Sequence, residues 1–286
     1  IASAYGENEL LKTITVDEHG KQVIEFKDKE GKIILKKVQL TAIPNNTLGN
    51  NYNGWLCTYY LYDEFNLLRG VVQPKGVELL VSSSWTFSND ILNEQMFRYE
   101  YDQKGRMIMK KVPGANMVEM VYDTRDRLIM SRDGRLNQQG YWLVNKYDSQ
   151  NRLIKIALLQ NSGSRATHQT SSDADINYPS TGLDILQENY YDDYSWITTP
   201  AQQGISGTMF TGDIISAFFI TTYNAAPYYA EQMTPDYLNV KGKQTGAKVR
   251  VLGSSTYLHS VVFYDSKGRV IQTRGANISG SYDITT

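Results

Sequence analysis

The sequence has little of what membrane proteins, disulfide-rich domains and nucleic-acid-binding proteins use. It has one cysteine, Cys57, so a disulfide framework within the chain is excluded, and this residue is interpreted as a small buried apolar side chain. No apolar run reaches the ~18 residues of a membrane-spanning helix. The 29 basic and 30 acidic residues leave a net charge of -1. Without such a run we expect no membrane span. Because nucleic-acid binding normally needs a basic surplus, we also expect no nucleic-acid partner.

Recognisable catalytic motifs are also missing. The sequence contains no GxSxG elbow, no HExxH and no paired-cysteine motif. We therefore predict that the chain is not an enzyme and has no cofactor site. A Ser/His/Asp site assembles across a fold, so a cryptic hydrolase using His168 or His259 stays open as a third alternative. The chain's remaining histidine is His19.

Acidic clusters do not predict a metal site. The pairs Asp173 with Asp175 and Asp192 with Asp193 lack the ligand number and glycine spacing of a calcium loop. A glycosidase needs two facing carboxylates, whereas the aspartates of the repeats recur at one position of a turn. We interpret them as turn residues and predict no metal.

What the sequence does have is tyrosine, 21 residues in all, arranged around a repeated hairpin. Phe97, Tyr99 and Tyr101 alternate with polar residues at the period of a β-strand. Asp102 can accept a hydrogen bond from the N–H two residues on, and Gly105 can adopt the left-handed conformation that closes the turn. The apolar Met107 to Met109 then begin a return strand. The stretch from Phe97 to Met109 thus predicts a β-hairpin.

The same arrangement recurs along the chain, in the pattern aromatic, Asp, two residues, Gly/Asn/Asp, Arg/Lys and two apolar residues. The third residue after each aspartate tolerates the left-handed conformation, as consecutive hairpins require. A weaker copy, YDEFNLLRG from Tyr62, has Leu67 in place of the basic residue, and the first two copies lack the tyrosine. The predicted structural turn residues are Asp17, Gly20, Asp28, Gly31, Tyr62, Asp63, Tyr101, Asp102, Gly105, Arg106, Tyr122, Asp123, Arg127, Tyr147, Asp148, Arg152, Tyr264, Asp265, Gly268 and Arg269.

These repeats resemble the YD repeats of Rhs proteins, a family that includes polymorphic toxin shells and is related to teneurin barrels. The stretches YDQKGRMI, YDTRDRLI, YDSQNRLI and YDSKGRVI carry the resemblance. Others, such as GLDILQENYYDDYSW and TGAKVRVLG, are similar to Rhs proteins of Bacteroidetes. The resemblance implies a fragment of a longer chain, secreted or at the cell surface of a bacterium. Its partners would be the rest of that chain and a C-terminal toxin domain enclosed by it.

Between the repeats the sequence predicts less regular structure. Thr41 to Asn53 is interpreted as a loop, residues 69 to 94 as strand or short helix with an N-cap at Ser88 or Asn89, and Asn161 to Pro179 as a long exposed loop. Apolar residues run together from Thr198 to Ala230. We predict one YD-repeat domain over residues 1–286 with an insertion between repeats over 161–235.

The predicted fold is all-β: antiparallel hairpin repeats in a wide, twisted, curled sheet, resembling part of a spiral β-barrel shell. The predicted function is that of a structural shell segment that encloses or presents a C-terminal effector. The alternative is a binding module whose aromatic face or insertion recognises a carbohydrate or cell-surface ligand. For the repeated basic residues we expect pairing with acids of adjacent hairpins, and for the tyrosines cross-strand packing.

Overall fold

The computed structural model describes residues 5–6, 8–42, 51–198, 205–209, 222, 226 and 235–286. Most of the apolar stretch from Thr198 to Ala230, and residues 43–50 of the predicted loop, lie outside the described residues. The chain forms two compact units, one of residues 1–140 and 162–176 and one of residues 141–161 and 177–286. The prediction of a single domain over 1–286 stays a prediction beside this division.

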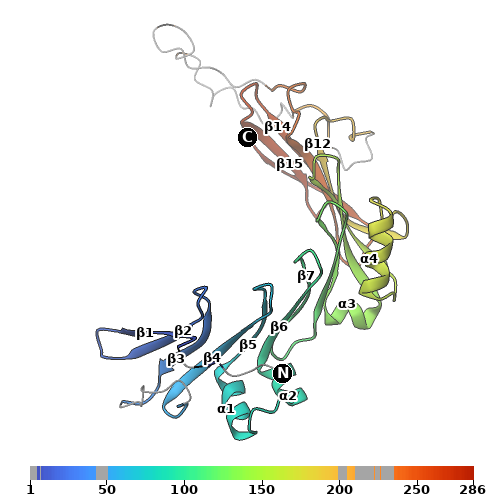
Figure 1. The fold of residues 1–286 in the computed structure, drawn as a ribbon. Coiled ribbons are helices and arrows are strands. Elements are labelled where there is room, and N and C mark those ends of the chain that lie inside the picture. Colours follow the sequence, from blue (N-terminus) through green and yellow to red (C-terminus); the bar gives the residue numbers. More distant parts are fainter. Residues whose placement is uncertain are drawn as a thin grey trace. The chain divides into compact units, whose positions relative to one another are not determined.

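Sixteen strands make up most of the described part of the two units (Figure 1). The strands of the first unit are β1 (Leu11–Val16), β2 (Gln22–Lys27), β3 (Ile33–Gln39), β4 (Trp55–Tyr62), β5 (Leu68–Val72), β6 (Met96–Tyr101), β7 (Met107–Lys111), β8 (Val118–Tyr122) and β9 (Leu128–Arg132). Those of the second unit are β10 (Tyr141–Tyr147), β11 (Leu153–Gln160), β12 (Leu183–Tyr191), β13 (Gln244–Arg250), β14 (Tyr257–Tyr264), β15 (Val270–Ala276) and β16 (Tyr282–Thr285).

Within each unit every strand pairs antiparallel with the next strand of the chain. Glu25 lies opposite Lys36 in β2 and β3, for example, and Asn145 lies opposite Ile156 in β10 and β11. The register shifts by one residue just before the Asp turns that follow β2, β4, β6, β8, β10 and β14, as between Glu100 and Tyr101, whereas the Asp17 turn after β1 has no shift. Such a bulge accommodates the extra residue of this turn type. The predicted all-β fold of antiparallel hairpins is therefore confirmed.

Two helices, α1 (Pro74–Ser82) and α2 (Asn89–Glu94), connect β5 to β6 and pack beside β4 and β6 (Figure 1). Pro74 begins α1, where its missing N–H costs no hydrogen bond. The Ser88 side chain accepts a hydrogen bond from the Ile91 N–H at 3.2 Å, so the predicted cap is confirmed and Ser88 provides it. The ambiguous stretch 69–94 thus contains one strand and two helices.

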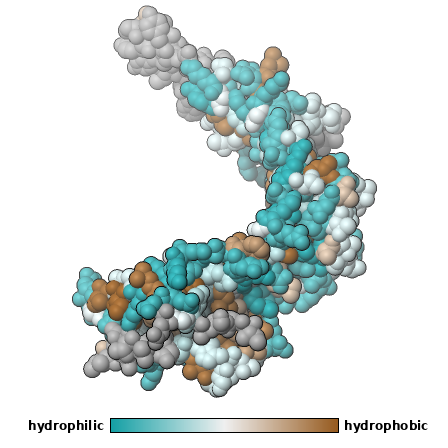
Figure 2. Space-filling view, viewed as in Figure 1, coloured by the Kyte–Doolittle hydropathy of each residue, from teal (hydrophilic) through white to brown (hydrophobic). Residues whose placement is uncertain are grey.

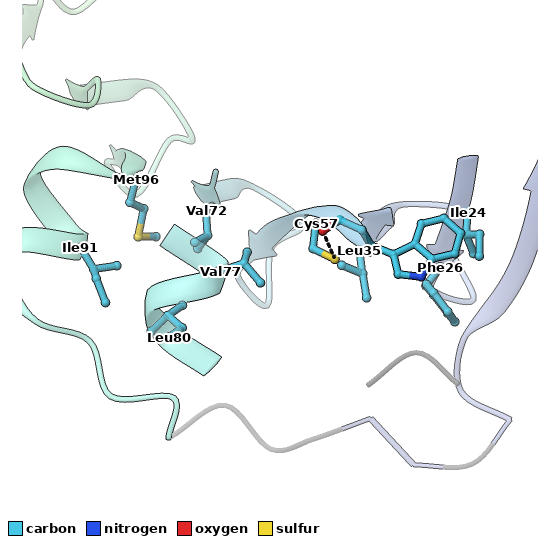
Figure 3. Packing of buried hydrophobic residues seen from close by; sticks show 10 residues of the cluster. Ile24, Phe26, Leu35, Cys57, Val72, Val77, Leu80, Ile91 and Met96 are labelled. Atoms are coloured by element: carbon cyan, nitrogen blue, oxygen red, sulfur yellow. Dashed lines mark hydrogen bonds between the residues drawn. The ribbon is translucent and has the colours of Figure 1, made fainter. Parts of the chain in front are cut away.

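The main core of the first unit lies between these helices and the sheet. Figure 3 shows Val77, Leu80 and Ile91 facing Val72 and Met96, and further along the sheet Cys57 beside Leu35, Ile24 and Phe26. Cys57 is buried, as predicted, and burial raises the pKa of its thiol to about 11. The thiol therefore stays protonated at neutral pH and contributes as an apolar side chain.

The prediction of an exposed loop over Asn161 to Pro179 is wrong for its middle part. Residues Arg165–Ala174 form helix α4, which belongs to the first unit and begins at an N-cap, Ser164. The Gln169 side chain accepts from the Tyr122 N–H at 3.1 Å and donates to the Tyr122 carbonyl at 2.8 Å. Because α4 is held by polar contacts and lacks large apolar residues, no apolar periodicity marked it as a helix.

The remaining helix, α3 (Gly134–Gln139), follows β9 and begins at the N-cap Asp133. Within the described residues, no helix is both long and apolar enough to cross a membrane. β1 forms an edge of the first unit's sheet and exposes Leu11, Ile14 and Val16, and hydrophobic atoms are visible at this edge in Figure 2. This edge leaves a row of backbone groups open to another strand.

Candidate functional site

The repeated turns share one hydrogen-bond pattern. In the turn that joins β6 to β7, Asp102 Oδ1 accepts from the N–H groups of Lys104 at 2.9 Å and Arg106 at 3.0 Å. The Asp102 N–H donates to the Arg106 carbonyl, and the Gly105 N–H donates to the Asp102 carbonyl. The same four bonds occur at Asp17, Asp28, Asp63, Asp123, Asp148 and Asp265.

The fourth residue of each turn adopts the left-handed backbone conformation. The φ angle is 75° at Gly105, and it is also positive at residues that are not glycine, 59° at Asp126 and 64° at Asn151. Aspartate and asparagine tolerate this region better than other side chains because they can hydrogen-bond locally. The turn is therefore set by local chemistry and does not depend on the rest of the sheet.

At two of the turns the arginine that follows, Arg106 or Arg152, also binds the next hairpin. Arg106 Nε donates to Asp102 Oδ2 at 2.7 Å, while its Nη1 donates to Asp126 Oδ1 in the following turn at 2.8 Å. Burial raises the pKa of Asp102, but the hydrogen bonds from Arg106 and from backbone N–H groups outweigh it and lower the pKa below its ordinary value. The expected pairing of basic residues with adjacent hairpins is confirmed at Arg106.

Repeat tyrosines donate hydrogen bonds to backbone carbonyls of the preceding hairpin. The Tyr122 hydroxyl donates to the Met107 carbonyl at 2.7 Å, and the Arg106 guanidinium lies 4.9 Å from the Tyr122 ring centre. Tyr101 likewise donates to the Leu68 carbonyl at 3.1 Å and lies beneath Arg69. Similar ring contacts occur between Lys32 and Tyr62, Arg152 and Tyr191, and Lys243 and Tyr264. Each of these tyrosines is half-buried against its neighbour.

In the weak repeat at Asp63, a residue at another position supplies the cation that contacts the aspartate and the next tyrosine. Leu67 occupies the usual basic position, and Arg69, two residues later, places its Nη1 3.8 Å from Asp63 Oδ2 and its guanidinium over Tyr101. Arg69 thus takes the role of the missing basic residue, because positions two apart in a strand lie on the same face.

These turns lie at one end of the sheet in each unit, because alternate connections of an antiparallel sheet fall on the same end. In the first unit the turns at this end are those of Asp28, Asp63, Asp102 and Asp123, and the Asp17 turn lies at the opposite end. In the second unit this end carries the Asp148 and Asp265 turns. We call the row of these turns within each unit its turn ladder.

One member of the turn ladder was not recognised in the sequence, because it is split. Asp192 follows Tyr191 at the end of β12, and its N–H donates to the carbonyl of Lys243 at 3.1 Å. Asp192 Oδ1 accepts from the Gly242 N–H at 2.6 Å, and Gly242 has a φ of 81°. Gly242 and Lys243 therefore occupy the places that Gly and Arg occupy in the other turns.

Residues 193–241 lie between the aspartate and the glycine of this turn. In the other repeats only two residues lie between these positions. The split turn still binds both neighbours, since Arg152 pairs with Asp192 and the Tyr264 hydroxyl donates to the Gln244 carbonyl at 2.7 Å. β12 lies inside the predicted insertion over 161–235, yet it pairs with β11 and β13. The sheet thus runs through part of that range, and the turn itself is interrupted at 193–241.

A further turn, between β15 and β16, uses asparagine in place of aspartate. Asn277 Oδ1 accepts from the N–H groups of Ser279 and Ser281, each at 3.1 Å, and Gly280 has a φ of 85°. Sequence reasoning missed it because it looked for aspartate, although an amide oxygen accepts the same bonds.

Beside the turn ladder, the second unit has a pocket of about 330 Å³. Tyr190 and Trp196 line it with parallel rings, 4.3 Å between centres and 3° between planes. The further lining residues are Asp148, Arg152, Ile154, Lys155, Glu188, Asn189, Tyr191, Asp192 and Asp193. The two rings stack on each other, and Trp196 also packs against the apolar cluster that contains Val261 and Phe263.

The three histidines lie on three different elements. His19 lies in the β1–β2 turn, His168 on α4 of the first unit and His259 on β14 of the second. Burial lowers the pKa of His168 and of His259. In the described part of the chain, no cluster of three or more His, Cys, Asp or Glu side chains is placed to hold a metal ion. The prediction that the chain is not an enzyme stays a prediction.

No family model matches the chain, and no curated protein matches its sequence. The chain is similar to solved structures of the TcdB2-TccC3 complex, one with TEV (TM-score 0.45, 11% identity, 90% of this chain and 11% of that chain) and one with Cdc42 (0.45, 10%, 93% and 12%). It is also similar to the Photorhabdus luminescens Tc holotoxin pore (0.44, 13%, 91% and 11%). The chain thus spans about a ninth of those chains, and at these values the similarity assigns no family.

Proposed function

We propose that this chain is a wall segment of a hollow β shell in a longer Rhs/YD-repeat protein, secreted or displayed at the cell surface. In this proposal the shell encloses or presents a C-terminal effector domain of the toxin kind. The segment acts by steric enclosure, with its hairpins as the barrier and no catalytic residue.

The observation that carries the proposal is the contact between consecutive turns. Arg106 binds its own Asp102 and the next turn's Asp126, while Tyr122 of that next hairpin binds back to Met107. Because a link of the same kind recurs where Arg152 binds Asp192, hairpins of this type can extend the sheet one after another, beside the helices that pack on it. A wall of arbitrary length can be built in this way.

One exposed feature in each unit fits a wall made of further hairpins. β1 exposes Leu11 and Val16 along an open edge, which a further strand would cover. In the second unit the Arg269 side chain is 54% exposed, whereas Arg106 is 13% exposed beneath the following hairpin. Arg269 Nε donates to its own Asp265, and the exposed part of the guanidinium can still bind an aspartate of another turn.

The test is limited proteolysis of the full-length protein that contains this segment, followed with an antibody against its C-terminal end. We expect the C-terminal region to resist a protease that cleaves it readily once it is expressed alone. The variant Arg106→Ala, which breaks one link between hairpins, should increase cleavage. Lys29→Ala removes a charge from an exposed position of the Asp28 turn, where no ion pair within the described residues links it to another hairpin, and serves as the control. If the C-terminal region of the intact protein is cleaved as fast as the isolated region, enclosure is contradicted.

A further inference from the structure

The turn that leads into β4 contains the one asparagine of the sequence that a glycine follows, Asn53 before Gly54. The Trp55 N–H donates to the Tyr52 carbonyl at 3.2 Å and closes the turn. Gly54, at the third place, has a φ of 85°, whereas Asn53, at the second place, has a negative φ, which makes this a type II turn. The Asn53 side chain is exposed at its tip.

The fold needs the glycine of this pair but not the asparagine. The left-handed conformation favours glycine, and a Cβ at Gly54 would lie 2.6 Å from Thr41 Oγ1. The Gly54 carbonyl accepts from the N–H groups of Leu40 at 2.9 Å and Thr41 at 3.3 Å, just beyond the end of β3. The Asn53 side chain, by contrast, makes no hydrogen bond to any residue that the structure describes. Another residue could therefore take its place.

Both groups that would react in a deamidation are accessible here. The Gly54 N–H has no hydrogen-bond partner in the described part of the chain, and no side chain of its own shields the nitrogen. The carbon that this nitrogen can attack, Asn53 Cγ, belongs to the preceding residue. The reaction is intramolecular and closes a five-membered ring, so the two groups do not have to meet by diffusion.

The asparagines of the repeat turns lack this freedom. Asn66 and Asn151 occupy the left-handed position, and the N–H that follows each of them donates to the aspartate of the turn at 2.9 Å. The next residue also has a side chain, a leucine in one turn and an arginine in the other, which hinders its nitrogen. The turn aspartate thus protects these asparagines, and the turn of Asn53 has no such aspartate.

We propose that Asn53 is a site of spontaneous deamidation, which changes this turn with time from neutral to anionic. The Gly54 nitrogen gives its proton to solvent and attacks Asn53 Cγ. The bond from Cγ to Nδ2 breaks, Nδ2 takes a proton from water and leaves as ammonia, and a succinimide remains. Water then opens the ring at either carbonyl and leaves aspartate or isoaspartate. Water is the only co-reactant, and nothing is oxidised or reduced.

The isoaspartate product should disturb the core beside the turn. It adds a methylene to the main chain between Tyr52 and Trp55 and so breaks the hydrogen bond that closes the turn. The Trp55 side chain is buried in the main core of the first unit, and the Tyr52 hydroxyl lies 2.6 Å from that of Tyr59. We expect the separated isoaspartate form to unfold at a lower temperature. Asn53→Asp, which changes only an exposed side chain, should unfold close to the unaltered chain.

The experiment is incubation of the purified chain at physiological temperature in mildly alkaline and mildly acidic buffer, followed by peptide mapping with mass spectrometry. We expect the peptide that contains position 53 to gain the mass that replaces an amide NH2 by a hydroxyl. The gain should be faster in alkali, because the attacking nitrogen must lose its proton. An isoaspartyl methyltransferase assay identifies the isoaspartate. Asn66 and Asn151 in the same digest are internal controls and should keep their amides.

Asn53→Gln is the matched variant, because its longer side chain would have to close a six-membered ring, and it should stay unmodified. A synthetic peptide of residues 51–56 sets the incubation time, which is long enough for that peptide to lose its amide. The proposal is overturned if the folded chain keeps its amide at position 53 over this time, or if Asn66 or Asn151 reacts as fast. The modification goes beyond the role of a shell wall, and neither result bears on enclosure, so the two proposals fail separately.

Discussion

The Arg152 guanidinium binds both oxygens of the Asp192 carboxylate, with Nη1 to Oδ1 at 2.8 Å and Nη2 to Oδ2 at 2.5 Å. The two residues are forty positions apart in the chain, and the pair joins the β10–β11 turn to the split turn after β12. The hydrogen bonds from Arg152 lower the pKa of Asp192 to about 2. This contact shows that the turn ladder continues through the interrupted repeat.

Arg152→Lys should weaken this link although it keeps the charge. A lysine ammonium cannot bind two carboxylate oxygens in the fork geometry of arginine. We expect a melting temperature a few degrees lower than that of the unaltered chain, and a similar loss in Asp192→Asn. Combined, the two substitutions should cost less than their sum, because both remove one interaction. Strictly additive losses in this double-mutant cycle would show that the pair is not coupled.

Gly105→Val should destabilise the β6–β7 turn through the backbone alone. Gly105 has a φ of 75°, and a Cβ there would meet no atom within 4 Å. The left-handed conformation costs a residue with a side chain about 1–2 kcal/mol, and a β-branched residue is affected most. Gly105→Asn is the matched control and should cost much less, since asparagine already occupies this place at Asn151. Chemical denaturation measures both, and equal losses would contradict the turn mechanism.

Tyr122→Phe should remove a link between hairpins without changing the ring. The hydroxyl donates to the Met107 carbonyl at 2.7 Å, and its loss leaves that carbonyl without this partner. We expect a loss of about 0.5–1.5 kcal/mol in the free energy of unfolding. Tyr99→Phe is the control, because its hydroxyl has no hydrogen bond within the residues that the structure describes. A larger effect at Tyr99 than at Tyr122 would be inconsistent with the account.

Helix α4 should detach progressively in acid. His168 is buried where α4 meets the sheet, and burial first, then nearby Arg132, lowers its pKa below the ordinary 6.5, while Glu119 acts in the opposite direction. Above pH 6.5 both docked and detached helix carry neutral imidazole, so docking has its full stability. As the pH falls below that value the detached helix takes up a proton that the docked one resists, and docking weakens.

The measurement is amide hydrogen exchange of residues 165–174 at about pH 8 and about pH 5, corrected for intrinsic rates. Protection should fall in acid, and His168→Asn should remove most of that pH dependence. Equal protection of α4 in the unaltered chain at both pH values would contradict a role for His168.

Sequence reasoning reached the features that depend on near neighbours in the chain. The Asp102 turn is closed by bonds to residues two and four positions on, so its spacing is visible in the sequence. The split turn was missed for the opposite reason, because Asp192 closes with Gly242, fifty positions later. Locality therefore decided which turns the sequence could predict.

Two other features were also missed. One depends on a long-range contact and the other on polar side chains. Trp196 lies over Gly246, and this long-range fit carries no local pattern, so the pocket could not be predicted. Helix α4 docks by Gln169 and Ser172, whose polar side chains made the segment look like a loop. Both side chains bind the Tyr122 backbone, which the sequence does not place beside the helix.

The most direct test of the central claim is a cryo-electron microscopy structure of the full-length protein that contains this segment. The proposal predicts that residues 1–286 form part of the wall of a hollow shell, with further hairpins added at β1 and beyond Arg269 and with the C-terminal domain inside. A segment that stands apart as a closed domain, with the C-terminal domain free in solvent, would contradict it.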